Sequence, residues 1–228
     1  MSSSIDGGLH PSCFTSSSDG STKDWSSLYE ALHDKLEGNA WLVGRKTMAE
    51  MSKGEPHPPS GPVDVSRPTH FARRDAAHFA IAVDTNGQLH FRGSEVGGDH
   101  VVVLLGGQVS NEHLAELTED GISYIVSGDK HVDLAESLAT LRRELCIERL
   151  LLEGGAAINR SFLAEGLVDE LNVVVAPALD ARAGMEGIVS FGEEGLAGRV
   201  RLSLRDCQRL EHGAVHLRYD VLPASDGG

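Results

Sequence analysis

Short apolar runs and amphipathic helical patterns alternate through the middle of the chain, and this alternation limits the possible folds more than any other feature. The runs at 101–105, 122–126 and 171–176 have the length and composition of buried strands. Helical patterns lie between them, beginning at Ser110 and at Asp133, two residue types that commonly cap helices. Strands that alternate with helices predict βαβ units and a largely parallel sheet.

The flanking segments extend this α/β pattern in both directions. Upstream, the sequence predicts a helix from Asp24, a strand at 40–43, a short helix at 46–51 and a strand at 79–83. Downstream, the segments at 200–204 and 215–221 predict an antiparallel hairpin, so the sheet should be mixed. We find no internal repeat and no clear linker, and therefore expect one domain spanning 1–228.

Residues 52–70 interrupt the pattern, because they hold five of the eight prolines: Pro56, Pro58, Pro59, Pro62 and Pro68. This composition predicts a loop, either a disordered excursion or a lid over a site.

The charge of the chain restricts what it can bind. Its formal net charge is −14 over 228 residues, which disfavours nucleic acid and anionic lipid as partners. Any phosphate site must therefore be built from backbone N–H groups and a few local cations. No apolar run approaches the roughly 18 to 20 residues of a membrane helix, and the N-terminus lacks the features of a signal peptide. We expect a soluble cytoplasmic protein.

The metal-binding residue types show no ligand spacing in the sequence. The three cysteines are far apart and fit neither a disulfide framework nor a zinc motif, which favours free thiols. The eleven histidines are scattered, and His57, His70 and His78 do not form a ligand pattern. We therefore expect no metal site.

The strongest candidate site is the turn Glu153-Gly154-Gly155-Ala156, which joins a predicted strand at 150–152 to a helix through Asn159. Glycines let a backbone approach a ligand closely, and a helix start presents unpaired N–H groups at the positive end of its dipole. A pyrophosphate would fit there. The alternative is a tight turn selected only for close packing.

A second candidate, Gly44-Arg45-Lys46-Thr47, also follows a buried strand and begins a helix. It combines two cations, a hydroxyl and helix N–H groups, and arginine suits bidentate contact with a 2′-phosphate. A solvated basic turn is the alternative. Both turns should lie at the carboxyl ends of strands, where α/β sheets bind ligands.

Two weaker candidates complete the set. Ser127-Gly128-Asp129 follows the strand at 122–126 and could hold the adenosine half of a dinucleotide, although it could equally be an ordinary polar loop. Ser4-Ile5-Asp6-Gly7 places a carboxylate beside a flexible glycine and could hydrogen-bond a substrate, whereas a plain surface loop is the default interpretation.

Taken together, these motifs resemble a known family. The chain is similar to the reductase domain of the riboflavin-biosynthesis deaminase–reductases, and more so to the stand-alone dihydrofolate-reductase-like members of that superfamily. The resemblance covers nearly the whole chain and is carried by Ser4-Ile5-Asp6-Gly7, Asp24-Trp25, Ala40 to Met48, Leu152-Glu153-Gly154-Gly155 with Asn159, and Glu165-Gly166-Leu167-Val168-Asp169-Glu170-Leu171.

The resemblance implies a dihydrofolate-reductase-like three-layer α/β sandwich that binds NADPH, in a family whose members are often homodimers. It implies cofactor contacts from Gly44, Arg45, Lys46, Thr47, Ser127, Gly128, Gly154, Gly155, Ala156 and Asn159. Ser4, Asp6 and Glu153 would face the substrate.

The chain departs from the riboflavin enzymes at two places. Their Asp-Asn-Pro…Leu-Thr…Arg stretch, which helps to hold a phosphorylated ribose, is replaced here by 48–53 and the proline-rich loop. Their first strand precedes the Ser-x-Asp-Gly motif, whereas almost nothing precedes Ser4 here. The zinc-deaminase signature is also missing, so neither zinc nor base deamination is expected.

Our hypothesis is hydride transfer to an electron-poor carbon of a small heterocyclic, ribosylamino-pyrimidine or pteridine-like substrate. Asp6, Glu153 and Asp24, in that order, are the carboxyl groups that could deliver a proton or orient the substrate. Asp24 could instead serve only its helix N-terminus. The alternatives are a non-catalytic nucleotide-binding module or sensor, and a true dihydrofolate reductase.

Overall fold

The computed structural model describes residues 1–62, 64–189 and 195–224, and the chain forms two compact units. Unit 2 is continuous, from Gly38 to Gly154, whereas unit 1 combines Met1–Glu37 with Gly155–Gly228. The single domain expected from the sequence stays a prediction.

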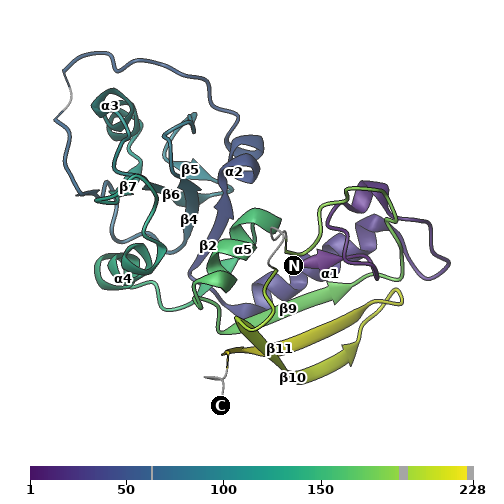
Figure 1. The fold of residues 1–228 in the computed structure, drawn as a ribbon. Coiled ribbons are helices and arrows are strands. Elements are labelled where there is room, and N and C mark those ends of the chain that lie inside the picture. The colour runs from purple at the N-terminus through teal and green to yellow at the C-terminus, as the bar shows by residue number, and fades with distance from the viewer. Residues whose placement is uncertain (63, 190–194, 225–228) are drawn as a thin grey trace. The chain divides into compact units, whose positions relative to one another are not determined.

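Unit 2 is built on a mixed sheet with the strand order β3-β7-β6-β4-β2-β8 (Figure 1). The pairs β7–β6, β6–β4, β4–β2 and β2–β8 are parallel. β3 pairs antiparallel with β7, and the short β5 pairs antiparallel with β6. The strands are β2 (Ala40–Gly44), β3 (Thr69–His70), β4 (Phe79–Asp84), β5 (Glu95–Val96), β6 (Asp99–Leu105), β7 (Ser123–Val126) and β8 (Leu150–Leu152).

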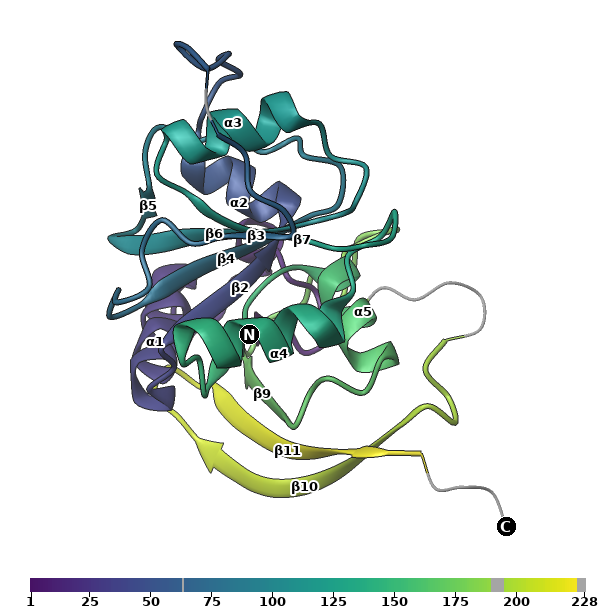
Figure 2. The ribbon, with the colours of Figure 1, turned by 90° about the vertical axis from the view of Figure 1, so that its left-hand side faces the viewer.

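Helices cover both faces of this sheet, which makes unit 2 a three-layer structure. Figure 2 shows α2 (Arg45–Ser52) and α3 (Asn111–Glu119) on one face and α4 (Leu134–Leu145) on the other. Alternate β6 residues Val101, Val103 and Leu105 are completely buried in one core with Leu114 and Leu117 of α3. Each such side chain contributes roughly 1.5 to 3 kcal/mol by its removal from water.

Unit 1 contains a second sheet in the order β1-β9-β11-β10. β1 pairs parallel with β9, and the other neighbours are antiparallel. Its elements are β1 (Ser2–Ser3), the 3-10 helix η1 (Pro11–Cys13), α1 (Thr22–Leu36), α5 (Ala156–Ala164), β9 (Glu170–Val175), β10 (Val200–Arg209) and β11 (Val215–Pro223). The Ser-x-Asp-Gly motif therefore does follow a strand, although β1 is very short.

Trp25 fixes α1 on this sheet. Its side chain is 2% exposed and packs against Val174, Ala176 and Ala214. Its indole N–H donates to the His212 carbonyl at 3.0 Å, so the one polar atom of the ring is also satisfied. The helix predicted from Asp24 thus packs on the sheet of unit 1.

The predicted α/β fold is confirmed, and each helix and strand expected between 24 and 221 is present within a few residues. The predicted hairpin is longer than expected, since β10 and β11 pair from Val200 to Pro223. It was expected to make the central sheet mixed, but it belongs to the unit 1 sheet, and the sheet of unit 2 is mixed through β3 and β5. The sequence did not predict β1, β3, β5 or η1, which are two or three residues long and therefore carry no detectable period. Among the described helices, none is long and apolar enough to span a bilayer.

The proline-rich loop is held along α3 at several points. The Ser60 hydroxyl and N–H donate to the Glu119 carboxylate near the end of α3. At the other end of the loop, the Arg67 guanidinium donates to the Val109 carbonyl at 2.6 Å and to Asn111 Oδ1 at 3.1 Å. The described part of the loop is thus fastened to α3, which argues against a disordered excursion.

Candidate cofactor site

The two glycine turns predicted as phosphate sites follow neighbouring strands of unit 2. β2 and β8 pair in parallel with Leu42 opposite Leu152, and the Glu153 N–H donates to the Leu42 carbonyl at 2.9 Å. Continued two residues beyond this last pair, the register places Gly44 beside Gly154. The two turns therefore meet at one edge of the sheet.

This edge is also where the strand order reverses. Apart from the short edge strand β3, successive strands β4, β6 and β7 lie progressively farther from β2, and the chain then returns to place β8 on the other side of β2. Ligands of open α/β sheets bind outside the carboxyl ends of the strands at such a switch point. The topology thus selects the edge at Gly44 and Gly154 as the candidate binding site of unit 2.

The Gly44 turn presents free N–H groups and free cations. Gly44 is the N-cap of α2 and, within the described chain, no side chain caps this helix start. Arg45 and Lys46 are exposed and form no hydrogen bond or ion pair with any described residue. Thr47 is half-buried, and completely buried Met48 anchors the helix. An anion here would meet both the helix dipole and two uncommitted cations.

The Gly155 turn has a similar backbone but a different electrostatic setting. Gly155 is the N-cap of α5, and the described residues provide no side-chain cap there either. A Cβ at Gly155 would lie 3.1 Å from Glu186 Oε1, so a carboxylate approaches this helix start. Glu186 also lies 3.3 Å from His10 Nε2. Ala156 is buried. This turn offers close backbone approach without an adjacent free cation.

Asn159 has a structural contact in α5. Its amide Nδ2 donates to the Ile188 carbonyl at 2.8 Å, and the side chain is 2% exposed. Its Oδ1 is buried and has no partner among the described residues. The predicted cofactor contact of Asn159 stays a prediction, and the visible role is to hold the segment at Ile188 against α5.

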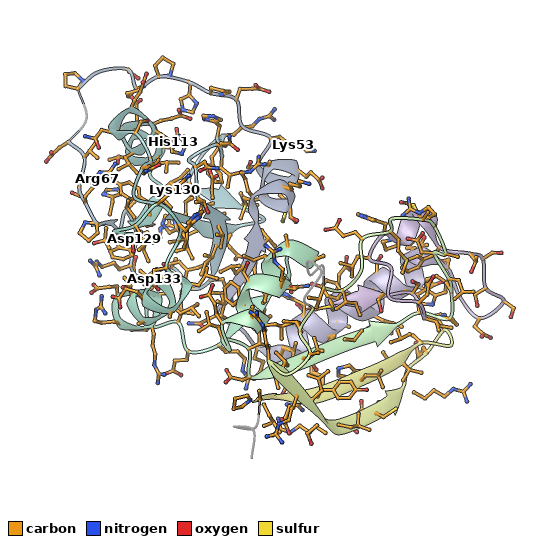
Figure 3. All side chains as sticks on the ribbon, viewed as in Figure 1. Lys53, Arg67, His113, Asp129, Lys130 and Asp133 are labelled. Atoms are coloured by element: carbon orange, nitrogen blue, oxygen red, sulfur yellow. The ribbon has the colours of Figure 1, made fainter. Side chains whose placement is uncertain are left out.

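The third turn lies on the loop after β7. The Ser127 hydroxyl oxygen accepts from the Asp133 N–H at 2.9 Å, which leaves its own O–H free to donate. Gly128 is exposed. Figure 3 shows Asp129 and Lys130 further along this loop. The turn could hold a ribose hydroxyl, as predicted, although Ser127 also helps to start α4.

Sequence reasoning missed Gly106 and Gly107, which directly follow β6. A Cβ on Gly107 would lie within 2.9 Å of the carbonyls of Ser127, Gly128 and Asp129, and the Gly107 N–H donates to Asp129 at 2.7 Å. These glycines therefore let the loops after β6 and β7 touch. The signal was present, because a glycine pair after a buried strand is also what identified Gly154 and Gly155.

Asp6 is a fully engaged carboxylate of unit 1. It accepts from the Ser4 hydroxyl at 2.5 Å and from the N–H groups of Asp180 at 3.0 Å and Ala181 at 2.8 Å. The hydrogen bond from Ser4, followed by those from the two N–H groups, lowers its pKa to about 2. A carboxyl group with that pKa is ionised at neutral pH and cannot act as a proton donor.

Ser4 shares this structural role. Its side chain is 1% exposed, and its oxygen also accepts from the Gly8 N–H at 2.8 Å. Ser4 and Asp6 thus contact each other, and their hydrogen bonds join the loop after β1 to the loop after β9. Any contact of these residues with a substrate stays a prediction.

Asp24 caps a helix. Together with the N-cap Ser21 it forms a complete capping box, and its Oδ2 accepts from the Ser21 N–H at 2.8 Å and hydroxyl at 2.7 Å. The hydrogen bonds from Ser21 lower the pKa of Asp24. This geometry supports the helix N-terminal role and offers nothing for proton delivery. Glu153, at the end of β8, is half-buried and lies next to Gly154.

The chain matches the model of the RibD C-terminal domain family over residues 1–216. The chain belongs to this family. The relationship predicted from the motifs is therefore confirmed.

Curated relatives of this RibD C-terminal domain chain carry the name 2,5-diamino-6-ribosylamino-4(3H)-pyrimidinone 5′-phosphate reductase. The protein from Methanothermobacter thermautotrophicus is 38% identical over 122 residues, which cover 51% of this chain and 53% of the relative. The protein from Aquifex aeolicus is 38% identical over 68 residues, or 30% of each chain. The matches thus span about half or less of the curated relatives' length.

Solved structures support the fold of this RibD C-terminal domain chain. A pyrimidine reductase-like protein from Corynebacterium diphtheriae has a TM-score of 0.65 at 18% identity, covering 97% of this chain and 89% of the other. RibD from Acinetobacter baumannii has a TM-score of 0.64 at 19% identity, covering 97% of this chain and 56% of the other. At these identities the likeness concerns the fold alone.

Proposed function

We propose that this chain is an NADPH-dependent reductase that acts on a small heterocyclic substrate of the ribosylamino-pyrimidine or pteridine class. The observation that carries this proposal is the adjacency of the Gly44 and Gly154 turns at the sheet's switch point. Family membership and the printed names of the relatives support the reductase class. A cytoplasmic location remains part of the proposal.

The residues of the site fit an anionic dinucleotide. The net charge of −14 repels such a ligand at long range, yet the α2 start supplies uncapped N–H groups beside Arg45 and Lys46. Arg45, Lys46 and Thr47 would hold the extra phosphate that distinguishes NADPH from NADH. Gly154, Gly155 and Ala156 would hold the pyrophosphate, and Ser127 and Gly128 the adenosine ribose.

NADPH supplies a hydride when it is bound. The protein's own residues would align and polarise the substrate. The carboxylate of Glu153 directly follows β8, is half-buried, and lies next to Gly154 at the edge where the two turns meet. We assign it to hydrogen-bonding the substrate or holding a proton for it. Asp6, being ionised and held by three donors, is assigned to fixing the loop at Ser4.

The decisive experiment separates binding from turnover. NADPH is titrated calorimetrically into the folded chain, and its oxidation is then followed by absorbance with a panel of ribosylamino-pyrimidines, pteridines and quinones. We expect binding together with oxidation by one substrate class. Binding without any oxidation would favour the non-catalytic module, and no heat of binding at millimolar NADPH would end the cofactor proposal.

Glu153→Gln tests the substrate role directly. We expect it to reduce turnover while NADPH binds as in the wild type. Full activity in this variant would remove Glu153 from the reaction. Glu148→Gln, an exposed glutamate in the same unit, is the matched control.

We further propose that the chain forms a homodimer through the edge of the unit 1 sheet. β10 is the edge strand, and its Leu202 and Leu204 are 49% and 58% exposed on one face. Exposed apolar residues on an edge strand favour pairing with another chain. Light scattering should give a dimer mass, which Leu204→Asp reduces to that of a monomer and the opposite-facing control Ser203→Asp does not.

A further inference from the structure

A cluster of imidazole and carboxylate groups lies on and around α3, away from the switch-point turns in the sequence. Three of its members, His90, His113 and Glu116, each offer a ligand atom within 4.8 Å of the others. His57 and Asp120 form a second such group with the same Glu116. The sequence analysis expected no metal site because these residues show no recognised ligand spacing, but folding brings them together.

Of these three residues, His113 and Glu116 are buried and His90 is half-buried, and their ligand atoms lie close to one another. Glu116 and His113 are both 6% exposed, although charged and imidazole side chains seldom lie so deep without partners. His90 Nδ1 lies 2.6 Å from Glu116 Oε1, and the His90 and His113 rings meet edge to face with centroids 5.5 Å apart. This arrangement is an array of N and O donors inside the protein.

One donor of this array is unsatisfied. His113 Nε2 is buried and has no hydrogen-bond partner among the described residues. A buried polar atom without a partner costs free energy, and a ligand would remove that cost.

The backbone fixes the positions of these side chains. His113 and Glu116 are three residues apart on α3 and therefore project from the same helix face. A Cβ on Gly87 would lie 2.8 Å from the His113 ring, so the turn at Gly87 packs directly against that ring. The His90 carbonyl accepts from the Ser52 hydroxyl at 3.1 Å, which ties His90 to the end of α2. The donors are thus preorganised.

We propose that His90, His113 and Glu116 bind a divalent transition-metal ion, with Zn²⁺ the best match. Two imidazoles and one carboxylate are a ligand set that zinc accepts, leaving a fourth position for water. The metal would replace the hydrogen shared by His90 Nδ1 and Glu116 Oε1 and would give His113 Nε2 its partner. This site goes beyond the proposed reductase activity and does not depend on it.

The second group, His57 and Asp120 with Glu116, connects the proposed metal site to the proline-rich loop. His57 belongs to that loop, its Nε2 lies 3.0 Å from Asp120 Oδ1, and its Nδ1 lies 3.5 Å from Glu116 Oε1. An ion on Glu116 would therefore lie next to the contact that holds this loop on α3. We assign the metal a structural role at the junction of α2, α3 and the loop.

The test uses the full chain without an affinity tag, stripped with a chelator and titrated with Zn²⁺ alone by calorimetry. We expect one Zn²⁺ per chain and a higher Tm in its presence. Both should be lost in His113→Gln and Glu116→Gln and kept in the matched control His78→Gln, which changes an exposed histidine of the same unit. Equal Zn²⁺ affinity in wild type and His113→Gln would overturn the proposal, as would the lack of one-to-one binding by folded wild type.

A second measurement covers the case in which the variants do not fold. Co²⁺ bound to the wild type should give the intense visible bands of a four-coordinate site. A weak spectrum like that of hydrated Co²⁺ would contradict the proposal. Neither readout involves NADPH or a substrate, so failure here would leave the reductase proposal untouched.

Discussion

The helix starts at Gly44 and Gly155 share a backbone design and differ in their charges. Each begins with a glycine N-cap after a strand, and neither has a side-chain cap within the described residues. At Gly44 the next two residues are exposed cations that form no hydrogen bond or ion pair with any described residue, whereas at Gly155 the Glu186 carboxylate lies 3.1 Å from the Cβ position. The first turn can attract an anion by charge, and the second can hold one only through N–H groups.

This difference suggests that the two turns make different contributions to binding an anionic ligand on an acidic protein. The cations at Gly44 would provide attraction and selectivity for an additional phosphate, and the bare backbone at Gly155 would provide close approach to a pyrophosphate. The glycine turn should therefore be sensitive to added volume, and the basic turn to lost charge. The following predictions test this distinction, beginning with the largest effect.

Adding volume at Gly155 should be the most damaging change. In Gly155→Val the new side chain would stand where backbone N–H groups must meet the ligand, so we expect NADPH affinity to fall by more than about 100-fold, the loss of two or more charge-assisted hydrogen bonds. Calorimetric titration measures this. The control is Gly93→Val, since a Cβ there meets no atom within 4 Å and the φ angle is not positive. Unchanged NADPH affinity in Gly155→Val would show that this turn serves only close packing and does not bind the cofactor.

Removing charge at the other turn should have a smaller and more selective effect. In Arg45→Gln combined with Lys46→Gln, we expect NADPH affinity to fall about 10- to 100-fold, because charge-assisted hydrogen bonds contribute roughly 1.5 to 3 kcal/mol. Titration with NADH in parallel should show a much smaller loss. The control Arg142→Gln removes an exposed cation of α4. Equal losses for the two coenzymes would contradict a 2′-phosphate site at Arg45 and Lys46.

Removing the carboxylate beside Gly155 should strengthen binding. Glu186 Oε1 lies 3.1 Å from the Cβ position of Gly155, and its charge competes with any other anion at this helix start. We expect Glu186→Gln to raise NADPH affinity about two- to fivefold, which corresponds to the roughly 0.3 to 1 kcal/mol of an exposed charge at a helix terminus. Glu148→Gln is the control for the same substitution at an exposed site. Weaker NADPH binding by Glu186→Gln would mean that this carboxylate helps the ligand.

The sequence predicted features that depend on neighbouring residues, such as turns and helix caps. It missed contacts between residues that are far apart in the chain. The glycine turns and the helix start at Ser110 were found because each is a local pattern with a local physical cause. Glu186 was missed, since nothing near it in the sequence indicates that it approaches Gly155. His90 was missed as a partner of Glu116 for the same reason, although the His113-x-x-Glu116 spacing on α3 was visible. The role of Asp24 was ambiguous because aspartate is common both at helix N-termini and in catalytic sites. Its capping box with Ser21 gives it a structural role.

Asp6 shows on a small scale that backbone N–H groups can stabilise an anion on this acidic chain. The Ser4 hydroxyl and the N–H groups of Asp180 and Ala181 lower its pKa from 3.8 to about 2. Since the folded-state pKa is the lower one, the ionised carboxylate stabilises the fold above about pH 4, and this contribution disappears as the pH falls toward 2. Asp6→Asn should therefore be less stable than wild type at neutral pH, and the difference in unfolding free energy should narrow between pH 4 and 2. Urea titrations at several pH values measure this difference in unfolding free energy. If the difference were constant with pH, hydrogen-bond donors without a cation would not lower the pKa of Asp6. That result would weaken the same argument for the Gly155 turn.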